Sequence, residues 1–278
     1  MDVIRCKGSN ICSPFTSPDP HDVAIYYVSA GTGEIYAYSP PQGTHTSVVF
    51  SGGEPYGAKF DASGRLHIAD CAHTALLRVD DSGQPGVMVK NYEEKSFRGP
   101  SSLAFGENET IYFTDSGPMG ETTLERPRGS VFCISPSPSG GQMLRPLAWE
   151  CLAHPSAIAT SPTDTKVLYV AEQMANRVLR LIQRPANTYH TSVFHQFAGG
   201  LGPSCVTVDR HGSLYVGHFD YSGPRRSQGK ISVLSSDGVV SRTLDVPGIE
   251  ITGICLSADE TTLYVTEAST NALYRIPL

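Results

Sequence analysis

Six hydroxyl-bearing residues recur along the chain, each two positions before an apolar residue. They are Ser13, Tyr56, Ser101, Ser156, Ser204 and Thr252, at intervals of 43 to 55 residues. A repeat of this length is typical of folds built from copies of one unit, which bring equivalent positions around a common site. Hydroxyl groups at such a site can bind a polar ligand or, with a base beside them, act as nucleophiles.

Several side chains near these hydroxyls are candidates for catalysis. His154 stands two positions before Ser156, and Glu250 stands two positions before Thr252. A serine nucleophile needs a base within hydrogen-bond reach, and His73 and His218 are further candidate bases. The chain has no Gly-x-Ser-x-Gly turn. A channel lined by hydroxyls that hold water is therefore favoured over a Ser–His site.

Other reactive groups have a simpler structural explanation. Cys12 and Cys205 could supply a thiol, but burial as small apolar side chains is favoured. Glu250 could act as an acid or base if it turns inward, or lie in a solvated loop. Carboxylates follow the second strand of four repeats, and we expect them to hold turns. These carboxylates are Asp70, Asp115, Glu172 and Glu267.

The elements between these residues read as strands. Each repeat contains a short aromatic and β-branched run typical of a buried strand. These runs are Ile25–Val28, Leu66–Ile68, Ile111–Phe113, Leu168–Val170, Leu214–Val216 and Leu263–Val265. Third strands are predicted at Ile35–Tyr38, Ala75–Val79, Ser130–Ile134, Arg177–Leu181, Lys230–Leu234 and Ala272–Ile276. Weaker fourth strands are predicted at Ser47–Phe50, Gly86–Lys90, Ser192–Gln196 and Val239–Leu244.

Six units of four strands predict an all-β, six-bladed β-propeller that forms a single domain over residues 1–278, with blades starting near residues 13, 56, 101, 156, 204 and 252. The last unit contains only three strands. Met1–Cys6 is predicted to supply its outer strand and so remove an exposed edge.

Composition excludes some partners. The net charge of −6 argues against a general nucleic-acid or anionic-membrane surface, and Arg225-Arg226 is expected to be a solvated exception. No run of residues is apolar enough for a signal peptide or a membrane span, so we expect a cytoplasmic monomer. Seven cysteines without Cys-x-x-Cys spacing are expected to be reduced thiols.

Three phrases carry a family resemblance. They are Gly53–Gly57 running into Gly64–Asp70, then Ile111–Ser116, then Val170–Arg180. They resemble strictosidine synthase-like proteins, which belong with gluconolactonases and paraoxonases in one superfamily of six-bladed propellers. The insertion at Gly117–Arg128 is also similar to that family.

The resemblance implies a calcium site in the central channel, but the matching positions carry other residues. Asparagine and aspartate ligands of the family fall at Ser101, Ser156 and Ser204-Cys205, and a glutamate falls at Cys12 or Ser13. A ring of neutral hydroxyls is a poor calcium site, so no cofactor is expected.

The catalytic groups implied by the resemblance are also replaced. A channel histidine of paraoxonases falls at Tyr56, and the catalytic glutamate of strictosidine synthase falls at Thr252. We therefore expect neither the acid–base chemistry of paraoxonases nor that of strictosidine synthase in this chain.

Two classes of function stay open. The first is a non-catalytic propeller that binds a small polar ligand in its channel or a protein partner on a rim. The second is a hydrolase of lactonase or esterase type, or a lyase, with a rebuilt site that uses Glu250, His154 or Tyr56. Fold alone does not decide between them.

Overall fold

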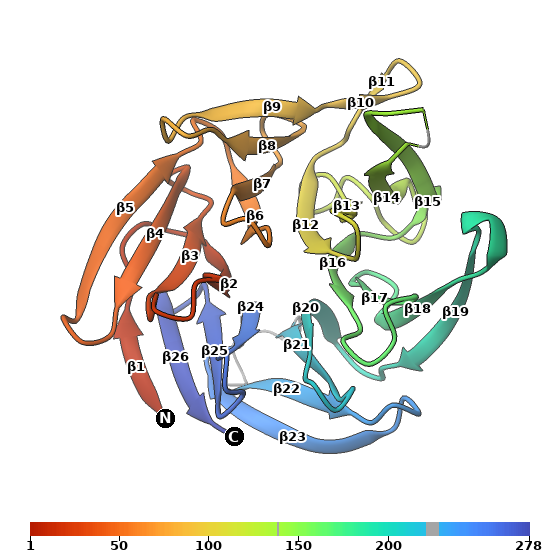
Figure 1. The fold of residues 1–278 in the computed structure, drawn as a ribbon. Helices are drawn as coiled ribbons and strands as arrows, with labels where there is room; N and C mark the ends of the chain where they lie inside the picture. Colours follow the sequence, from red (N-terminus) through yellow and green to blue (C-terminus); the bar gives the residue numbers. More distant parts are fainter. Residues whose placement is uncertain (138, 221–227) are drawn as a thin grey trace.

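The strands form six four-stranded antiparallel sheets arranged like blades around a central channel (Figure 1). The structure, a computed structural model, describes residues 1–137, 139–220 and 228–278, so Arg225-Arg226 lies outside the described residues. The predicted six-bladed propeller is confirmed.

Each of the first three blades runs from an inner to an outer strand in chain order. Blade 1 contains β2 (Ile11–Thr16), β3 (Ile25–Ser29), β4 (Glu34–Ser39) and β5 (Thr44–Phe50). Blade 2 contains β6 (Pro55–Phe60), β7 (Leu66–Asp70), β8 (Ala75–Val79) and β9 (Pro85–Val89). Blade 3 contains β12 (Pro100–Phe105), β13 (Ile111–Asp115), β14 (Gly129–Pro136) and β15 (Gln142–Leu152).

The second half of the ring repeats this order. Blade 4 contains β16 (Pro155–Thr160), β17 (Val167–Glu172), β18 (Arg177–Gln183) and β19 (Tyr189–Gln196). Blade 5 contains β20 (Leu201–Val208), β21 (Leu214–Asp220), β22 (Gln228–Leu234) and β23 (Val240–Pro247). Blade 6 contains β24 (Ile251–Leu256), β25 (Thr262–Glu267) and β26 (Ala272–Pro277).

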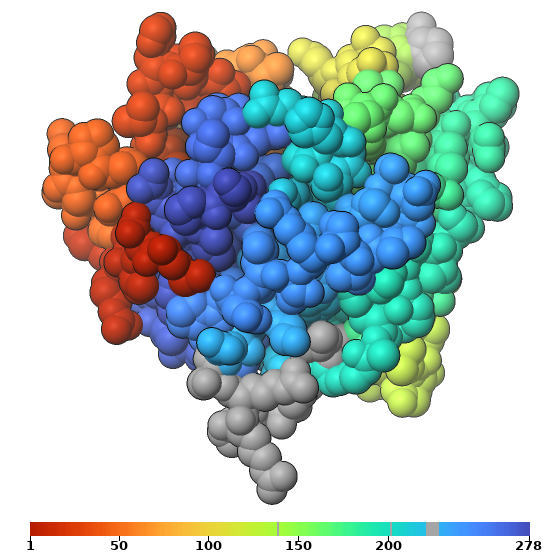
Figure 2. Space-filling view, turned by 90° about the horizontal axis from the view of Figure 1, so that it is seen from below, coloured from red at the N-terminus to blue at the C-terminus, as the bar shows by residue number. Residues whose placement is uncertain are grey.

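The N-terminal strand β1 (Asp2–Arg5) completes blade 6, as predicted. It pairs antiparallel with β26, with Val3 opposite Tyr274. Figure 2 shows the red N-terminal segment lying beside the blue strands of the last blade. The closure pairs the outer edge of β26, which an open ring would leave exposed.

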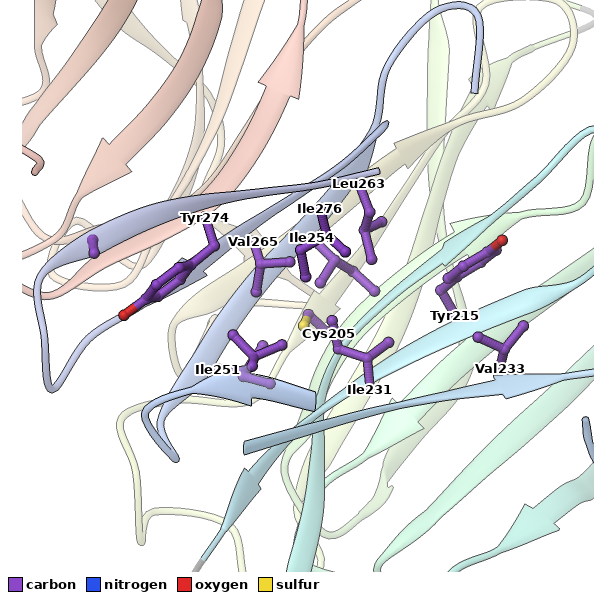
Figure 3. Close-up of a cluster of buried hydrophobic side chains, with 12 residues drawn as sticks. Cys205, Tyr215, Ile231, Val233, Ile251, Ile254, Leu263, Val265, Tyr274 and Ile276 are labelled. Atoms are coloured by element: carbon purple, nitrogen blue, oxygen red, sulfur yellow. The ribbon is translucent and has the colours of Figure 1, made fainter. Parts of the chain in front are cut away.

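Apolar cores lie between neighbouring blades. Between blades 5 and 6, Ile231 from β22 packs with Ile251 from β24 and Val265 from β25, all fully buried (Figure 3). Fully burying a side chain of this size contributes roughly 1.5–3 kcal/mol relative to its exposed state. Because each blade packs against two neighbours, the inner strands are held rigidly around the channel.

Three short elements were not predicted. They are β10 (Asn91–Tyr92), β11 (Lys95–Ser96) and the 3-10 turn Pro185–Asn187. The fourth strand of blade 3, β15, was also missed. Across the described ranges, no helix has the length and apolar character needed to cross a membrane.

Candidate functional site in the central channel

A β-bulge interrupts the inner strand of each blade where the recurring hydroxyl stands. In blades 3, 4 and 5, the pairing register shifts across Ser101, Ser156 and Ser204. The register also shifts across Tyr56 in blade 2 and Thr252 in blade 6. A bulge breaks the alternation of side chains and redirects the extra residue. The bulge therefore changes the direction of the side chain at the recurring hydroxyl position.

The redirected side chains line a cavity of about 360 Å³ at one end of the channel. Five of the six predicted ring residues are among its lining residues, namely Tyr56, Ser101, Ser156, Ser204 and Thr252. In blade 1, Asn10 and Cys12 line the cavity and Ser13 does not. The register there shifts between Cys12 and Phe15, so Ser13 shares its bulge with a second residue. His154 and Glu250 also line the cavity.

Three of the ring hydroxyls connect their blade to the next one. Ser156 Oγ donates to the carbonyl of Pro203 at 2.9 Å, and Ser204 Oγ donates to the carbonyl of Ile251 at 2.5 Å. Thr252 Oγ1 closes the ring by donating to the carbonyl of Ile11 at 2.6 Å. A hydroxyl has one proton to donate. These three oxygens therefore offer a ligand lone pairs and no free proton.

Replacing Thr252 with valine tests this structural role. Valine keeps the shape but leaves the carbonyl of Ile11 without the hydroxyl donor, so we expect a loss of about 1–3 kcal/mol in the free energy of unfolding. Urea unfolding measures it. Thr46→Val is the matched control on the exposed face of β5 and is expected to change stability by less than about 0.5 kcal/mol. Equal stability of the two variants would contradict the role.

The insertion in blade 3 positions His154. Thr122 Oγ1 accepts a hydrogen bond from the backbone N–H of His154 at 3.0 Å and donates to the carbonyl of Ser116 at 2.9 Å. The imidazole is 6% exposed, and its Nδ1 has no hydrogen-bond partner in the described structure. Burial lowers the pKa of His154 to about 4, so the ring is neutral at pH 7.

His154 and Ser156 do not form a nucleophile–base pair. Ser156 Oγ donates to Pro203, as described above, and no hydrogen bond joins it to His154 in the described parts of the chain. The other two candidate bases lie outside the cavity lining. His73 Nδ1 lies 3.1 Å from Asp70 Oδ1, and His218 Nε2 lies 2.9 Å from Ser232 Oγ.

Glu250 provides the carboxylate of the cavity. Its side chain is half-buried and makes no hydrogen bond or ion pair with the residues that the structure describes. Burial raises the pKa of Glu250, and the nearby charge of Glu267 raises it further. An unpaired carboxylate with a raised pKa is the usual form of a general base.

Tyr56 and the two channel cysteines are less suited to catalysis. Tyr56 OH donates to Glu54 Oε1 at 3.0 Å, and burial raises the pKa of the phenol. Burial also raises the pKa of Cys12 and of Cys205 to about 12. Both thiols are therefore protonated at pH 7, which agrees with their predicted role as small buried groups.

The four carboxylates at the ends of second strands make structural hydrogen bonds to backbone N–H groups. Two of them, Asp70 and Glu267, hold the turn that follows, as predicted for all four. Asp70 Oδ1 accepts from the backbone N–H of Glu54 at 3.0 Å, and Asp115 Oδ1 accepts from that of Gly99 at 2.8 Å. The other two accept in the same way, Glu172 from the N–H of Ala153 and Glu267 from the N–H of Glu250. Each bond fixes the segment that enters the inner strand of the same blade.

Thr122 binds the backbone of His154, a contact that the sequence pattern did not reveal. It lies in the irregular insertion, outside the repeat, and contacts His154 across 32 positions of the chain. The insertion itself was recognised, but a hydrogen bond at this separation has no local sequence signature.

The fold and the cavity define a six-bladed propeller with a candidate site at one end of its channel. The chain belongs to the SMP-30/Gluconolactonase/LRE-like region family, whose family model matches residues 17–272. Lactonase drp35 from Staphylococcus aureus is 27% identical over 150 residues, which cover 52% of this chain and 41% of that protein. The match thus spans less than half of the relative's length.

Solved structures share the fold. A gluconolactonase from Xanthomonas campestris superposes with a TM-score of 0.82 at 21% identity, covering 99% of this chain and 88% of that chain. Regucalcin from Agrobacterium tumefaciens, described as a calcium-binding protein, superposes with a TM-score of 0.77 at 16% identity, covering 96% and 89%. At these sequence identities, the structural similarity shows that the proteins share a fold and shows nothing further.

Proposed function

We propose that the channel cavity binds a small lactone or ester and hydrolyses it without a resident metal ion, with Glu250 as the general base. The observation that carries the proposal is the unpaired carboxylate of Glu250 in the cavity lining. A cavity of about 360 Å³ suits a small organic molecule. Membership of a family whose relatives are named lactonase and gluconolactonase supports this class of substrate.

The donor set of the cavity does not fit calcium. Calcium takes six to eight oxygens and favours carboxylates. Among the described residues that line the cavity, Glu250 is the one carboxylate. The ring hydroxyls are neutral, and those of Ser156, Ser204 and Thr252 donate to backbone carbonyls. The described ranges contain no group of three or more His, Cys, Asp or Glu that could hold a metal ion. The proposed hydrolysis therefore does not involve calcium.

The proposed step uses water as the nucleophile. Glu250 takes a proton from water while the water oxygen attacks the acyl carbon, and the carbonyl oxygen becomes negatively charged. The neutral ring of His154 and the side-chain amide of Asn10, both in the cavity lining, can donate hydrogen bonds to that oxygen. When the tetrahedral intermediate collapses, the ester C–O bond breaks and the proton on Glu250 passes to the leaving alkoxide.

Binding without turnover is the second candidate function. The observation that favours it is that the ring hydroxyls of Ser156, Ser204 and Thr252 already donate to carbonyls and cannot stabilise an oxyanion. A ligand rich in hydroxyl or amine donors would match these acceptors. In that case, Glu250 would accept a hydrogen bond from the ligand.

A panel of lactones and aryl esters, assayed with and without a chelator, tests the metal-free hydrolase. We expect hydrolysis to persist in the chelator and millimolar calcium to leave the Tm unchanged. A calcium-induced rise of several degrees that the chelator reverses would contradict the metal-free site. Compounds that raise the Tm without being hydrolysed would favour binding without turnover.

A further inference from the structure

The end of the channel opposite the candidate site contains a second, separate cavity. It has a volume of about 220 Å³. Its polar lining side chains are Thr16, Lys59, Thr207 and Cys255, and its apolar ones include Phe15 and Phe60. These residues come from the inner strands β2, β6, β20 and β24.

The two cavities lie at opposite ends of the inner strands. The first is lined by residues at the bulges near the strand starts, and Lys59, Thr207 and Cys255 each come three positions later than the ring residue of the same strand. At about 3.3 Å per residue, three positions correspond to roughly 10 Å along the channel. The second cavity therefore belongs to a different site.

Lys59 is a cation without a partner among the described residues. Its side chain is half-buried and makes no hydrogen bond or ion pair with any residue of the described ranges. Burial in the channel lowers the pKa of Lys59. Burial also raises the pKa of Cys255 to about 11, so the thiol beside Lys59 is neutral at pH 7 and does not balance its charge. An unpaired, partly desolvated ammonium is unfavourable unless a ligand compensates for it.

A second hydrogen-bond donor accompanies Lys59. The hydroxyl of Thr207 makes no side-chain hydrogen bond to the described residues and faces the same cavity. At the other end of the channel, the ring hydroxyls donate to carbonyls and present lone pairs. The two ends thus differ in charge: the first cavity contains the carboxylate of Glu250, and the second contains the ammonium of Lys59.

We propose that this second cavity binds a small oxyanion, a carboxylate or phosphate group, through the ammonium of Lys59 and the hydroxyl of Thr207. The anion supplies a negative charge that balances the ammonium of Lys59. Its oxygens accept hydrogen bonds from Lys59 and Thr207. The site is independent of the proposed hydrolysis, because it shares no lining residue with the first cavity.

Thermal unfolding of the full chain with inorganic phosphate or acetate, at constant ionic strength, tests this proposal. One or both anions are expected to raise the Tm of the wild type and of Lys166→Met, a control at an exposed lysine outside the cavity. Lys59→Met is expected to weaken the apparent affinity about ten-fold or more. It is also expected to raise the Tm without anion, because methionine removes an uncompensated charge.

A measurement on the unmodified chain guards against a variant that fails to fold. Pyridoxal phosphate followed by borohydride reduction is expected to label Lys59, and phosphate or acetate is expected to reduce that labelling, as measured by peptide mass spectrometry. The responses to phosphate and acetate show which oxyanion the site prefers. The proposal is overturned if neither anion raises the Tm of the wild type, or if the response persists unchanged in Lys59→Met.

Discussion

Replacing Glu267 with alanine is expected to lower the free energy of unfolding by about 3–5 kcal/mol. The carboxylate is 0% exposed. Its Oε1 accepts from the backbone N–H of Glu250 at 3.0 Å and of Ser269 at 3.2 Å, and from Ser269 Oγ at 2.5 Å. Its Oε2 accepts from the N–H of Thr270 at 2.7 Å and from the Thr270 hydroxyl. Alanine would leave these donors without their shared acceptor, and hydrogen bonds to a charged group are among the stronger ones.

The surrounding backbone is built around the same carboxylate. Gly248 has a φ of +87°, and a Cβ at this position would lie 2.4 Å from the Cδ of Glu267. Only glycine satisfies both the left-handed backbone and this close approach. The loop that carries Glu250 into the cavity therefore depends on Glu267, and its loss is expected to reduce any activity of the site together with stability.

Urea or thermal unfolding of Glu267→Ala and Glu267→Gln measures the effect. Glutamine keeps one acceptor oxygen but directs an NH₂ group at some of the donors, so an intermediate loss is expected. Glu107→Ala, at an exposed glutamate, is the control and is expected to change stability by less than about 0.5 kcal/mol. A loss in Glu267→Ala as small as in this control would contradict the turn-holding role.

The fold could be predicted because its signals are local and repeated. Runs such as Leu168–Val170 return six times with turns around them, and the missing strand of the last unit indicates closure by Met1–Cys6. Strand β15 was missed because Arg145, Pro146 and Glu150 interrupt its apolar pattern. A single edge strand with bulges lacks the alternation that identifies the inner strands.

Five of the six predicted ring residues line the cavity, but their hydrogen bonds could not be predicted. The repeat indicates that Ser156, Ser204 and Thr252 face the channel. Whether a hydroxyl proton points at a ligand or at the carbonyl of the next blade depends on contacts across 47 residues for Ser204 and 241 for Thr252. Sequence spacing does not specify this geometry. The geometry decides whether the ring hydroxyls act as donors or acceptors toward a ligand.

Glu250→Gln is expected to lower kcat/KM for lactone or ester hydrolysis by about 10²–10⁴-fold, the usual contribution of a general base. Glutamine has nearly the same shape and can still bind a ligand, so KM is expected to change less than kcat. Glu107→Gln, at an exposed residue outside the cavity lining, is the matched control and is expected to retain the wild-type kcat/KM. Full activity in Glu250→Gln would exclude this carboxylate as the base.

The pH dependence of kcat/KM tests the same assignment without changing the site. Because burial and Glu267 raise the pKa of Glu250, the base ionises above the usual range of a glutamate. Activity should therefore rise with pH through this raised pKa and fall as the carboxylate becomes protonated. Burial lowers the pKa of His154 to about 4, so the ring is neutral at pH 7. Glu267→Gln removes the charge that raises this pKa, so the acidic limb of the variant should move to lower pH. An acidic limb that stays in place would mean that another group controls the reaction.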